Sequence, residues 1–481
     1  MTKNNSELAS LARRRALQKM GGLTACGLLP GLSGLLSMQS AEAAGSYKAL
    51  VCVFLFGGND ANNMIVPTDS SNYATYLAAR GGIVGTPSNG ALALPNAGQS
   101  GGVLQLAALN GTSYNYGLHP GMPELQNLWG SGNVALLFNV GNLVQPFSSA
   151  AAFLANQNAN LVPLNLYSHS DQQRQMQMTS LNTIGTTGWG GRLADSINSS
   201  GKSIPATISA AGNALFLLGA QSAQIVVPGK GTMSYNGFNS SSTSQARLSA
   251  LKALFGGAPD TLLAQTLGAT QSASIGTADT LSPILSNAAV KTLSGNFTDY
   301  STNTLSQQLT QVAALIQAAS SGAISAPAQQ IFFVSLNGFD THNDQLNRQA
   351  PLLANLSSAL NGFYKTMVSM NQHNNVVAFT LSDFARTLKP ASGGGSDHAW
   401  GSHHIIVGGS AAVKGGTYGN FPNLTLAGAS DVSAEGRWLP TTSVDQYGAT
   451  LANWLGANAS AIGSAFPNLV NFSTANLGFL T

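Results

Sequence analysis

The scarcest charged side chains of this sequence gather in one segment. Five of its seven histidines and four of its 17 acidic residues lie between residues 338 and 404. Two short motifs stand out there, Asp340-Thr341-His342 and Asp397-His398. Carboxylate and imidazole are the side chains that bind hard and borderline divalent metals. The segment therefore predicts a metal site.

Three carboxylates follow apolar runs that have the length and composition of buried strands. Each alone could cap a helix, but ligands gather where the carboxyl ends of parallel strands meet. Asp60 follows the apolar run 48–56, Asp340 follows 330–336 and Asp383 follows 376–381. With the histidines of the same segment, the predicted metal ligands are Asp60, Asp340, His342, Asp383, Asp397, His398, His403 and His404.

Two of these histidines compete for one role. His403 and His404 begin an apolar strand, and successive strand residues point to opposite faces. We therefore expect at most one of them to reach the metal site, with the other as a hydrogen-bonded structural residue.

The elements that must position these groups alternate along the chain. Apolar runs predict strands at 48–56, 133–140, 330–336, 376–381 and 404–407. Apolar residues spaced by three and four predict a helix that Pro351 opens and that runs to about residue 371, and Pro123 can open another. Such alternation indicates an α/β fold with a mostly parallel sheet covered on both faces. Residues 229–325, rich in Ser, Thr, Ala and Gln, predict a helical insertion or cap on a domain spanning 44–481.

The N-terminus has the features of an export signal. Arg13-Arg14-Arg15 precedes an apolar run that ends in the small-x-small site Ala41-Glu42-Ala43. The paired arginines fit the twin-arginine pattern, so we expect residues 1–43 to be a signal peptide and the mature protein to be periplasmic or secreted. No transmembrane segment is expected after its removal.

Composition excludes one class of partner. Only 8% of residues are charged, and the net charge of +3 owes much to the basic N-terminus. Without a basic stripe there is no electrostatic case for nucleic acid. The sequence gives no indication of oligomeric state.

Several motifs, taken in order, resemble a known family. They look like the exported family labelled domain of unknown function 1501, over about residues 46 to 457. That family is similar to the alkaline phosphatase superfamily, which includes sulfatases and phosphomutases. The motifs are Gly57-Gly58-Asn59-Asp60, Leu118-His119-Pro120, Ser168-His169, Phe339-Asp340-Thr341-His342, Ser382-Asp383-Phe384-Ala385-Arg386, Asp397-His398-Ala399-Trp400-Gly401 and Val444-Asp445-Gln446-Tyr447.

The resemblance implies a fold and a set of roles. The implied fold is a three-layer α/β/α sandwich with a two-metal site on the strand ends. Ser168, before a helical pattern, resembles the superfamily's nucleophile, with His169 beside it; the alternative role for Ser168 is a helix cap. Arg386 is a candidate anion partner, and its alternative role is a surface salt bridge. Phe384 stands where the superfamily carries a histidine. Two registers are open: Asp397-His398 completes the first metal site, or it is the Asp-His pair and His403 or His404 closes the site.

Two functions of different classes follow. The first is a metal-dependent hydrolase of phosphate or sulfate esters that uses a serine alkoxide beside one or two divalent ions. Zn or Mn fits the mixed His and Asp ligands, with Mg or Ca as alternatives. The second is a non-catalytic, metal-containing protein that binds envelope or carbohydrate components. We accordingly expect the substrate or ligand to be a small anionic ester or a glycan. A Ser-His-Asp esterase is disfavoured because no Gly-x-Ser-x-Gly turn follows a strand.

Overall fold

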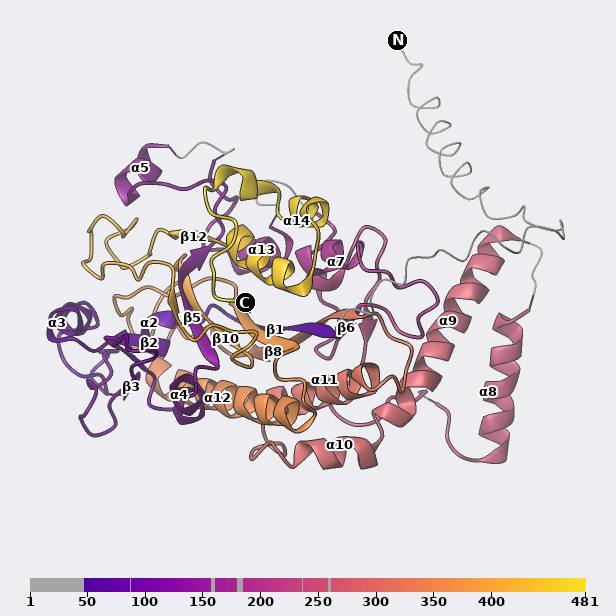
Figure 1. Ribbon diagram of the computed structural model, residues 1–481. Helices are drawn as coiled ribbons and strands as arrows, with labels where there is room; N and C mark the ends of the chain where they lie inside the picture. The colour runs from indigo at the N-terminus through magenta and orange to yellow at the C-terminus, as the bar shows by residue number, and fades with distance from the viewer. Residues whose placement is uncertain (1–46, 87, 157–160, 180–184, 236, 258–260) are drawn as a thin grey trace, which may run out of the picture. The chain divides into compact units, whose positions relative to one another are not determined.

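The computed structural model describes residues 47–86, 88–156, 161–179, 185–235, 237–257 and 261–481 (Figure 1). The predicted signal peptide at 1–43 lies outside these residues.

The strands have the following bounds: β1 Lys48–Phe56, β2 Ile65–Pro67, β3 Leu104–Gln105, β4 Tyr116–Leu118, β5 Val134–Gly141, β6 Thr207–Ser209, β7 Ile225–Val226, β8 Gln329–Asn337, β9 Val376–Ser382, β10 Ser402–Val407, β11 Gly416–Tyr418 and β12 Thr442–Ser443. The helices are α2 Ala61–Met64, α3 Ser70–Ala79, α4 Pro123–Gly130, α5 Ala150–Ala155, α6 His169–Met178, α7 Trp189–Ala194, α8 Ser242–Phe255, α9 Leu262–Ile284, α10 Asn287–Ser294, α11 Thr304–Ser320, α12 Gln345–Ser369, α13 Val444–Leu455 and α14 Ala459–Ala465, with 3₁₀ turns η1 Leu215–Leu217 and η2 Pro467–Asn471.

One large mixed sheet organises the fold. Its strand order in the described residues is β11-β5-β10-β9-β1-β8-β6-β7, and β12 also pairs with β5. β1 is parallel to both β8 and β9, while β10 runs antiparallel to β9 and β5. The sheet is thus mostly parallel, which confirms the predicted α/β class. All five strands predicted from apolar runs are present, with ends within two residues of the prediction.

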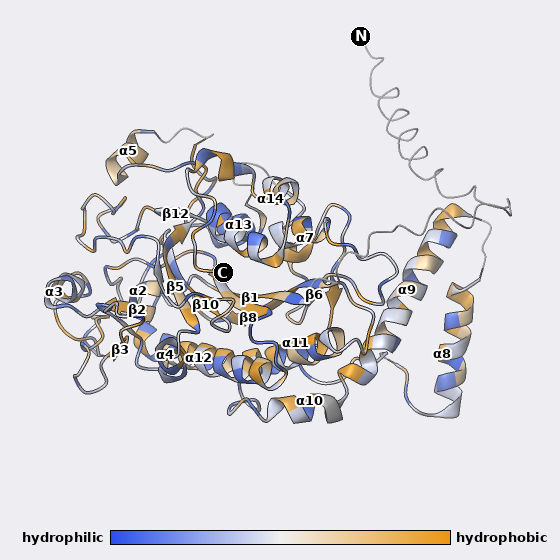
Figure 2. Ribbon diagram, viewed as in Figure 1, coloured by the Kyte–Doolittle hydropathy of each residue, from blue (hydrophilic) through white to orange (hydrophobic). Residues whose placement is uncertain are grey.

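Both faces of strand β1, in the centre of the sheet, are buried, because its side chains alternate between two apolar clusters. Ala49, Val51 and Val53 belong to one cluster, and Leu50, Cys52 and Phe54 to the other. Helices α4, α11 and α12 add side chains to the first cluster, and α7, α13 and α14 add theirs to the second (Figure 1). The hydropathy colouring shows the apolar strands between the more mixed helices (Figure 2).

The predicted start of the long helix at Pro351 is wrong: α12 begins at Gln345 and contains Pro351. The backbone N–H of Gln345 donates to the carbonyl of Gly394, so a distant loop fixes the helix start.

Between β7 and β8 the chain forms α8 to α11, of which α11 is largely buried against β8 whereas α8 and α9 are largely exposed. Across the described residues, none of the helices combines the length and apolar character needed to cross a bilayer.

The two adjacent histidines of β10 point to opposite faces of the sheet, and both are buried. His403 packs between Phe138 and Phe421, and its Nδ1 accepts a hydrogen bond from the backbone of Asn139. The ring of His404 stacks on Tyr447 at a centroid distance of 5.5 Å. Burial lowers the pKa of both imidazoles to about 3. Both histidines are therefore held neutral in the folded core.

These buried histidines predict acid sensitivity. As pH falls below the ordinary value of 6.5, the unfolded chain takes up a proton on His404 and the folded chain does not, so stability present above pH 6.5 is lost toward pH 3. Replacing His404→Phe, which keeps a ring against Tyr447, should reduce the stability lost between pH 6.5 and about pH 4 by about 3 kcal/mol. Urea unfolding at several pH values measures this. An unchanged pH profile would contradict it.

Candidate metal centre

The parallel register of the central strands places the candidate site. Phe56 of β1 lies opposite Asn337 of β8, and Leu55 lies opposite Ser382 of β9, so the three strands end at one edge. The chain segments that leave this edge carry Asp340 and Asp383. Gly57 makes the close approach possible: its φ is +112°, and a Cβ there would overlap the backbone of Asp340. The edge of the sheet therefore brings residues from distant segments together.

Four side chains converge beyond this edge. Among the described residues, one group of three donors suits a metal: His169, Asp340 and His398 have ligand atoms within 4.8 Å of one another. His342 adds a fourth donor, since its Nε2 lies 3.0 Å from Asp340 Oδ1 and 2.9 Å from His398 Nε2. The Nε2 atoms of His169 and His398 lie 3.4 Å and 3.6 Å from the same oxygen. Three imidazole nitrogens thus surround one carboxylate oxygen.

Each of the three imidazoles has an acceptor at its other nitrogen. His169 Nδ1 lies 2.7 Å from Asp383 Oδ2, and His342 Nδ1 lies 3.2 Å from Asp397 Oδ1. His398 Nδ1 lies 2.7 Å from the carbonyl oxygen of Tyr167, which can only accept. These contacts favour the tautomer with hydrogen on Nδ1, which leaves each Nε2 as a free electron pair. Metal-binding histidines are held in this way in proteins.

The convergence of electron pairs requires a positive charge. Nε2 of His169 is buried and has no hydrogen-bond partner. Two Nε2 electron pairs 2.9 Å apart beside a carboxylate repel one another unless a proton or a cation lies between them. Ligands bonded at about 2.1 Å in a tetrahedron lie about 3.4 Å apart. The observed separations of 2.9 to 3.6 Å match that value, so the residues present fit a divalent metal ion.

The neighbouring charges tune the group. Burial alone would raise the pKa of Asp340, but the charge and hydrogen bond of Arg386, with the nearby histidines, outweigh it and lower the pKa. The hydrogen bond to Asp383 raises the pKa of His169. Burial lowers the pKa of His398. Asp340 is therefore held ionised, as a metal ligand must be.

Arg386, predicted as an anion partner for a substrate, lies buried behind the group. Its Nη1 donates to Asp340 Oδ1 and to the carbonyl of Gly57, each at 3.0 Å. Its Nε donates to the carbonyl of Ser396 at 3.1 Å. The side chain has no exposed area. Arg386 thus orients Asp340 and joins three loops, rather than facing a ligand.

Asp60, one of the predicted metal ligands, lies outside the group. Its Oδ2 forms a fully buried ion pair with Arg80 at 2.5 Å and also accepts from Gln345. Its Oδ1 caps α2 by accepting from the backbone of Asn62. Both oxygens of Asp60 therefore have hydrogen-bond partners. Arg80, twenty residues further along the chain, neutralises the charge of the carboxylate in the core.

The other predicted ligands divide into two classes. Asp383 and Asp397 do not join the donors but contact the imidazoles of His169 and His342. Asp383 Oδ2 also accepts from Gln173 and from the backbone of Gly57. His403 and His404 lie in the apolar core on β10, where burial and ring packing account for them.

Ser168 precedes α6 at the N-cap position and adjoins His169 in sequence. Its hydroxyl donates to Asp171 Oδ2 at 2.7 Å and contacts Ser170, and it makes no hydrogen bond to the helix backbone. Asp171 therefore holds the hydroxyl that was predicted as the nucleophile.

Sequence reasoning missed three contributions to the site. His169 was predicted as catalytic through its neighbour and not as a metal ligand. Gln173, one turn further along α6, donates to Asp383 at 2.7 Å. Tyr167 contributes through a backbone carbonyl, which no side-chain pattern reports. A signal for the first two was present, since His169 and Gln173 are four residues apart and share one helix face.

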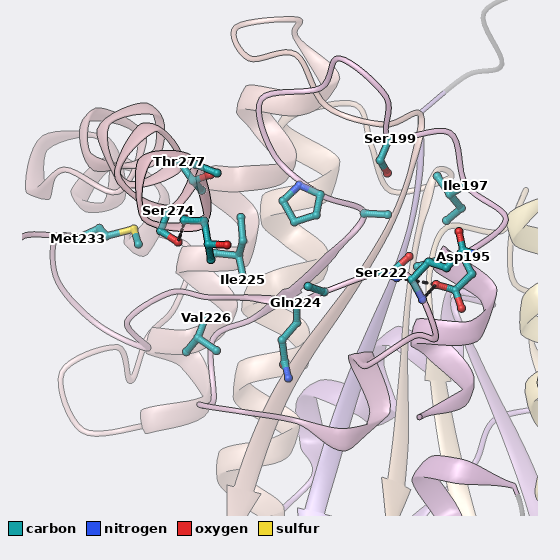
Figure 3. A pocket seen from close by; sticks show the side chains of 17 residues that line it. Asp195, Ile197, Ser199, Ser222, Gln224, Ile225, Val226, Met233, Ser274 and Thr277 are labelled. Atoms are coloured by element: carbon teal, nitrogen blue, oxygen red, sulfur yellow. Dashed lines mark hydrogen bonds between the residues drawn. The ribbon is translucent and has the colours of Figure 1, made fainter. Parts of the chain in front are cut away.

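A cavity of about 790 Å³ lies elsewhere, beside β6, β7 and α9 (Figure 3). Its lining contains none of the donor residues. The carboxylate of Asp195 accepts backbone hydrogen bonds from Ala220, Gln221 and Ser222, so it organises a loop. The cavity therefore contributes no side chain to the histidine group.

The placement of Asp60 yields a prediction. Asp60→Asn leaves Arg80 buried without its counter-charge and should destabilise the protein by about 3 to 5 kcal/mol in urea unfolding. Because Asp60 lies outside the donor group, the metal content of the folded variant should equal that of the unmodified protein in elemental analysis. A stoichiometric loss of metal with little loss of stability would show that Asp60 is a ligand.

The contact between Asp383 and His169 yields a second prediction. Asp383→Asn removes the charge that orients the ring and should weaken metal binding about 10- to 100-fold. Asp171→Asn is the matched control: Asp171 lies in the first turn of α6, as His169 does, but is bonded to Ser168. This variant should leave the metal affinity unchanged. Competition with a chromophoric chelator measures both. Equal affinities in the two variants would argue against a role for Asp383.

Comparisons with known proteins give a family match for part of the chain. Residues 320–439, which include three of the four donors, match the family described as "Protein of unknown function (DUF1501)". No curated protein sequence matches the chain at a significant level.

Similarity to solved structures is weak. One match is a crystal structure described as Ps i-CgsB in complex with k-i-k-neocarrahexaose. It has 8% sequence identity and a TM-score of 0.35, with 89% of this chain and 77% of that chain covered. Another is a crystal structure of Ps i-CgsB, with 8% identity, a TM-score of 0.32, and 89% and 78% of the two chains covered.

Proposed function

We propose that this protein is an exported, metal-dependent hydrolase of phosphate or sulfate esters. The observation that carries the proposal is the convergence of three imidazole Nε2 atoms on one carboxylate oxygen. The donors come from α6, from the segment after β8 and from the loop before β10, at the carboxyl end of a parallel sheet. Such ends are where ligands bind in α/β folds.

His169, Asp340, His342 and His398 would hold one divalent ion, with Zn or Mn as the best match to three nitrogens and one oxygen. Bound there, the ion would polarise an ester oxygen as a Lewis acid. Asp383, Asp397 and the carbonyl of Tyr167 hold the three rings in the required tautomer. Arg386 holds Asp340 in place.

Ser168 is the proposed nucleophile. Asp171 orients its hydroxyl and can accept its proton, at a hydrogen-bond distance of 2.7 Å. The hydroxyl lies at the start of α6, a ten-residue helix whose first amides favour a negatively charged ester. Attack of the Ser168 oxygen on phosphorus or sulfur would break the bond to the alcohol of the ester, which leaves with the proton that Ser168 gave up. The resulting covalent ester of Ser168 would then be cleaved by water.

Two further parts of the proposal concern architecture and location. The packing of helices on both faces of the sheet agrees with the alkaline phosphatase-like three-layer arrangement that the motifs imply. The buried ion pair of Asp60 favours one ion over two. Export through the twin-arginine pathway to the periplasm or the outside of the cell rests on residues 1–43.

A second function is favoured by a different observation. Phe384 packs against His169 and His398 at centroid distances of 4.7 and 4.8 Å, which covers one side of the group with an apolar ring. This enclosure suits a metal that stabilises the fold. The alternative is a non-catalytic, metal-containing protein that binds an envelope component or a glycan.

Elemental analysis combined with turnover of nitrophenyl phosphate and nitrophenyl sulfate separates the two. The hydrolase should contain one divalent ion and turn over one ester class. Ser168→Ala should lower kcat on the order of a thousandfold or more, while the matched Ser170→Ala should not.

Other outcomes decide against parts of the proposal. Stoichiometric metal without turnover of either ester would favour the binding protein. Turnover that survives Ser168→Ala would remove the serine from the mechanism. A folded protein that binds no divalent ion would overturn both functions.

A further inference from the structure

One arginine contacts two parts of the candidate site without joining the donors. Arg437 Nε donates to the backbone carbonyl of His398 at 2.7 Å. The guanidinium Cζ lies 5.1 Å from the ring centre of Tyr167. His398 in turn donates from Nδ1 to the carbonyl of Tyr167. Arg437, His398 and Tyr167 thus form a closed ring of contacts.

Tyr167 has an unfavourable backbone conformation at this point. Its φ is +73°, a left-handed value that bulky residues rarely adopt. Such a conformation costs on the order of 1 to 3 kcal/mol and persists only where surrounding contacts enforce it. Here the N–H of Tyr167 donates to Gln172 and its carbonyl accepts from His398. The ring packing of Arg437 on Tyr167 is the third contact that holds the residue.

This conformation joins two ligands that are far apart in sequence. Tyr167 lies two residues before His169, the first residue of α6. His398 lies in the loop before β10, and its ring centre is 4.3 Å from that of His169. The Tyr167 carbonyl therefore fixes the tautomer of His398, while the Tyr167 N–H, which donates to Gln172, joins the same residue to the first turns of α6.

Arg437 itself is fixed by a tight turn. Asp431 accepts backbone hydrogen bonds from Ser433, Gly436 and Arg437. The carbonyl of Arg437 accepts from the backbone of Val432. The ion pair of Arg437 with Glu435 is partly exposed and worth little by itself. The turn therefore presents the guanidinium in one orientation.

We propose that Arg437, with Tyr167, is a positioning residue that assembles the metal centre by clamping His398 to the start of α6. This inference rests on the proposed metal site and names residues that set its affinity. Without the clamp, Tyr167 can leave its strained conformation, His398 loses its acceptor at Nδ1, and the distance between the His169 and His398 donors is no longer fixed.

Metal affinity of two variants tests the clamp. Arg437→Met keeps an aliphatic chain over the ring but removes the donor to His398, and should weaken Zn²⁺ binding about 10- to 100-fold in chelator competition. Glu435→Gln removes only the partly exposed ion pair and should match the unmodified protein. Unfolding curves confirm that each variant is folded.

A second readout is independent of metal. In the metal-free protein, ¹⁵N spectra of the imidazoles should show His398 fixed with hydrogen on Nδ1, and Arg437→Met should give a mixture of tautomers. Unchanged affinity and unchanged tautomer in Arg437→Met would overturn the clamp. If the unmodified protein binds no Zn²⁺, the proposed function fails, whereas the imidazole spectra still decide whether Arg437 fixes His398.

Discussion

Hydrogen bonding of β8, β1 and β9 in parallel register is the constraint on which the candidate site depends. It ends three buried strands at one edge of the sheet and leaves Gly57 against the backbone of Asp340. The positive φ of Gly57 and its lack of a side chain allow this approach. Asp340, Asp383 and Arg386 are brought together there because their chain segments leave the same edge. A shift of register would separate them.

The donors themselves do not explain the site, since Nε2 electron pairs that face one another beside a carboxylate repel unless a proton or a cation lies between them. The surrounding acceptors make the arrangement specific. A carboxylate, a second carboxylate and a backbone carbonyl each face one Nδ1, so all three Nε2 atoms are directed at Asp340. Contacts around the donors hold them in this arrangement, including those of the buried Arg386 and of Tyr167 in its left-handed backbone conformation. This arrangement is expected where ligand geometry must be set before the ion binds.

Much of the fold could be predicted from local patterns. Short apolar runs rich in β-branched and aromatic residues indicated the strands, because both faces of a covered parallel sheet must be apolar. Helix ends were less predictable. Pro351 was taken as the first turn of a helix, whereas the backbone of Gly394 holds a start six residues earlier at Gln345. Such contacts between distant segments leave no local pattern.

By itself, the sequence determined the residue types available for chemistry and the segments that carry them. It concentrated Asp340, His342, Asp383, Asp397 and His398 near the ends of predicted strands. The tertiary structure decided which of them converge. It placed His169 among the candidate metal donors. It also placed Asp383 and Asp397 against the imidazole rings, and His403 and His404 in the core. It also paired Asp60 with Arg80. The physical reason is that a carboxylate or imidazole acquires its role from the charge, burial and acceptors around it, and those neighbours come from elsewhere in the chain.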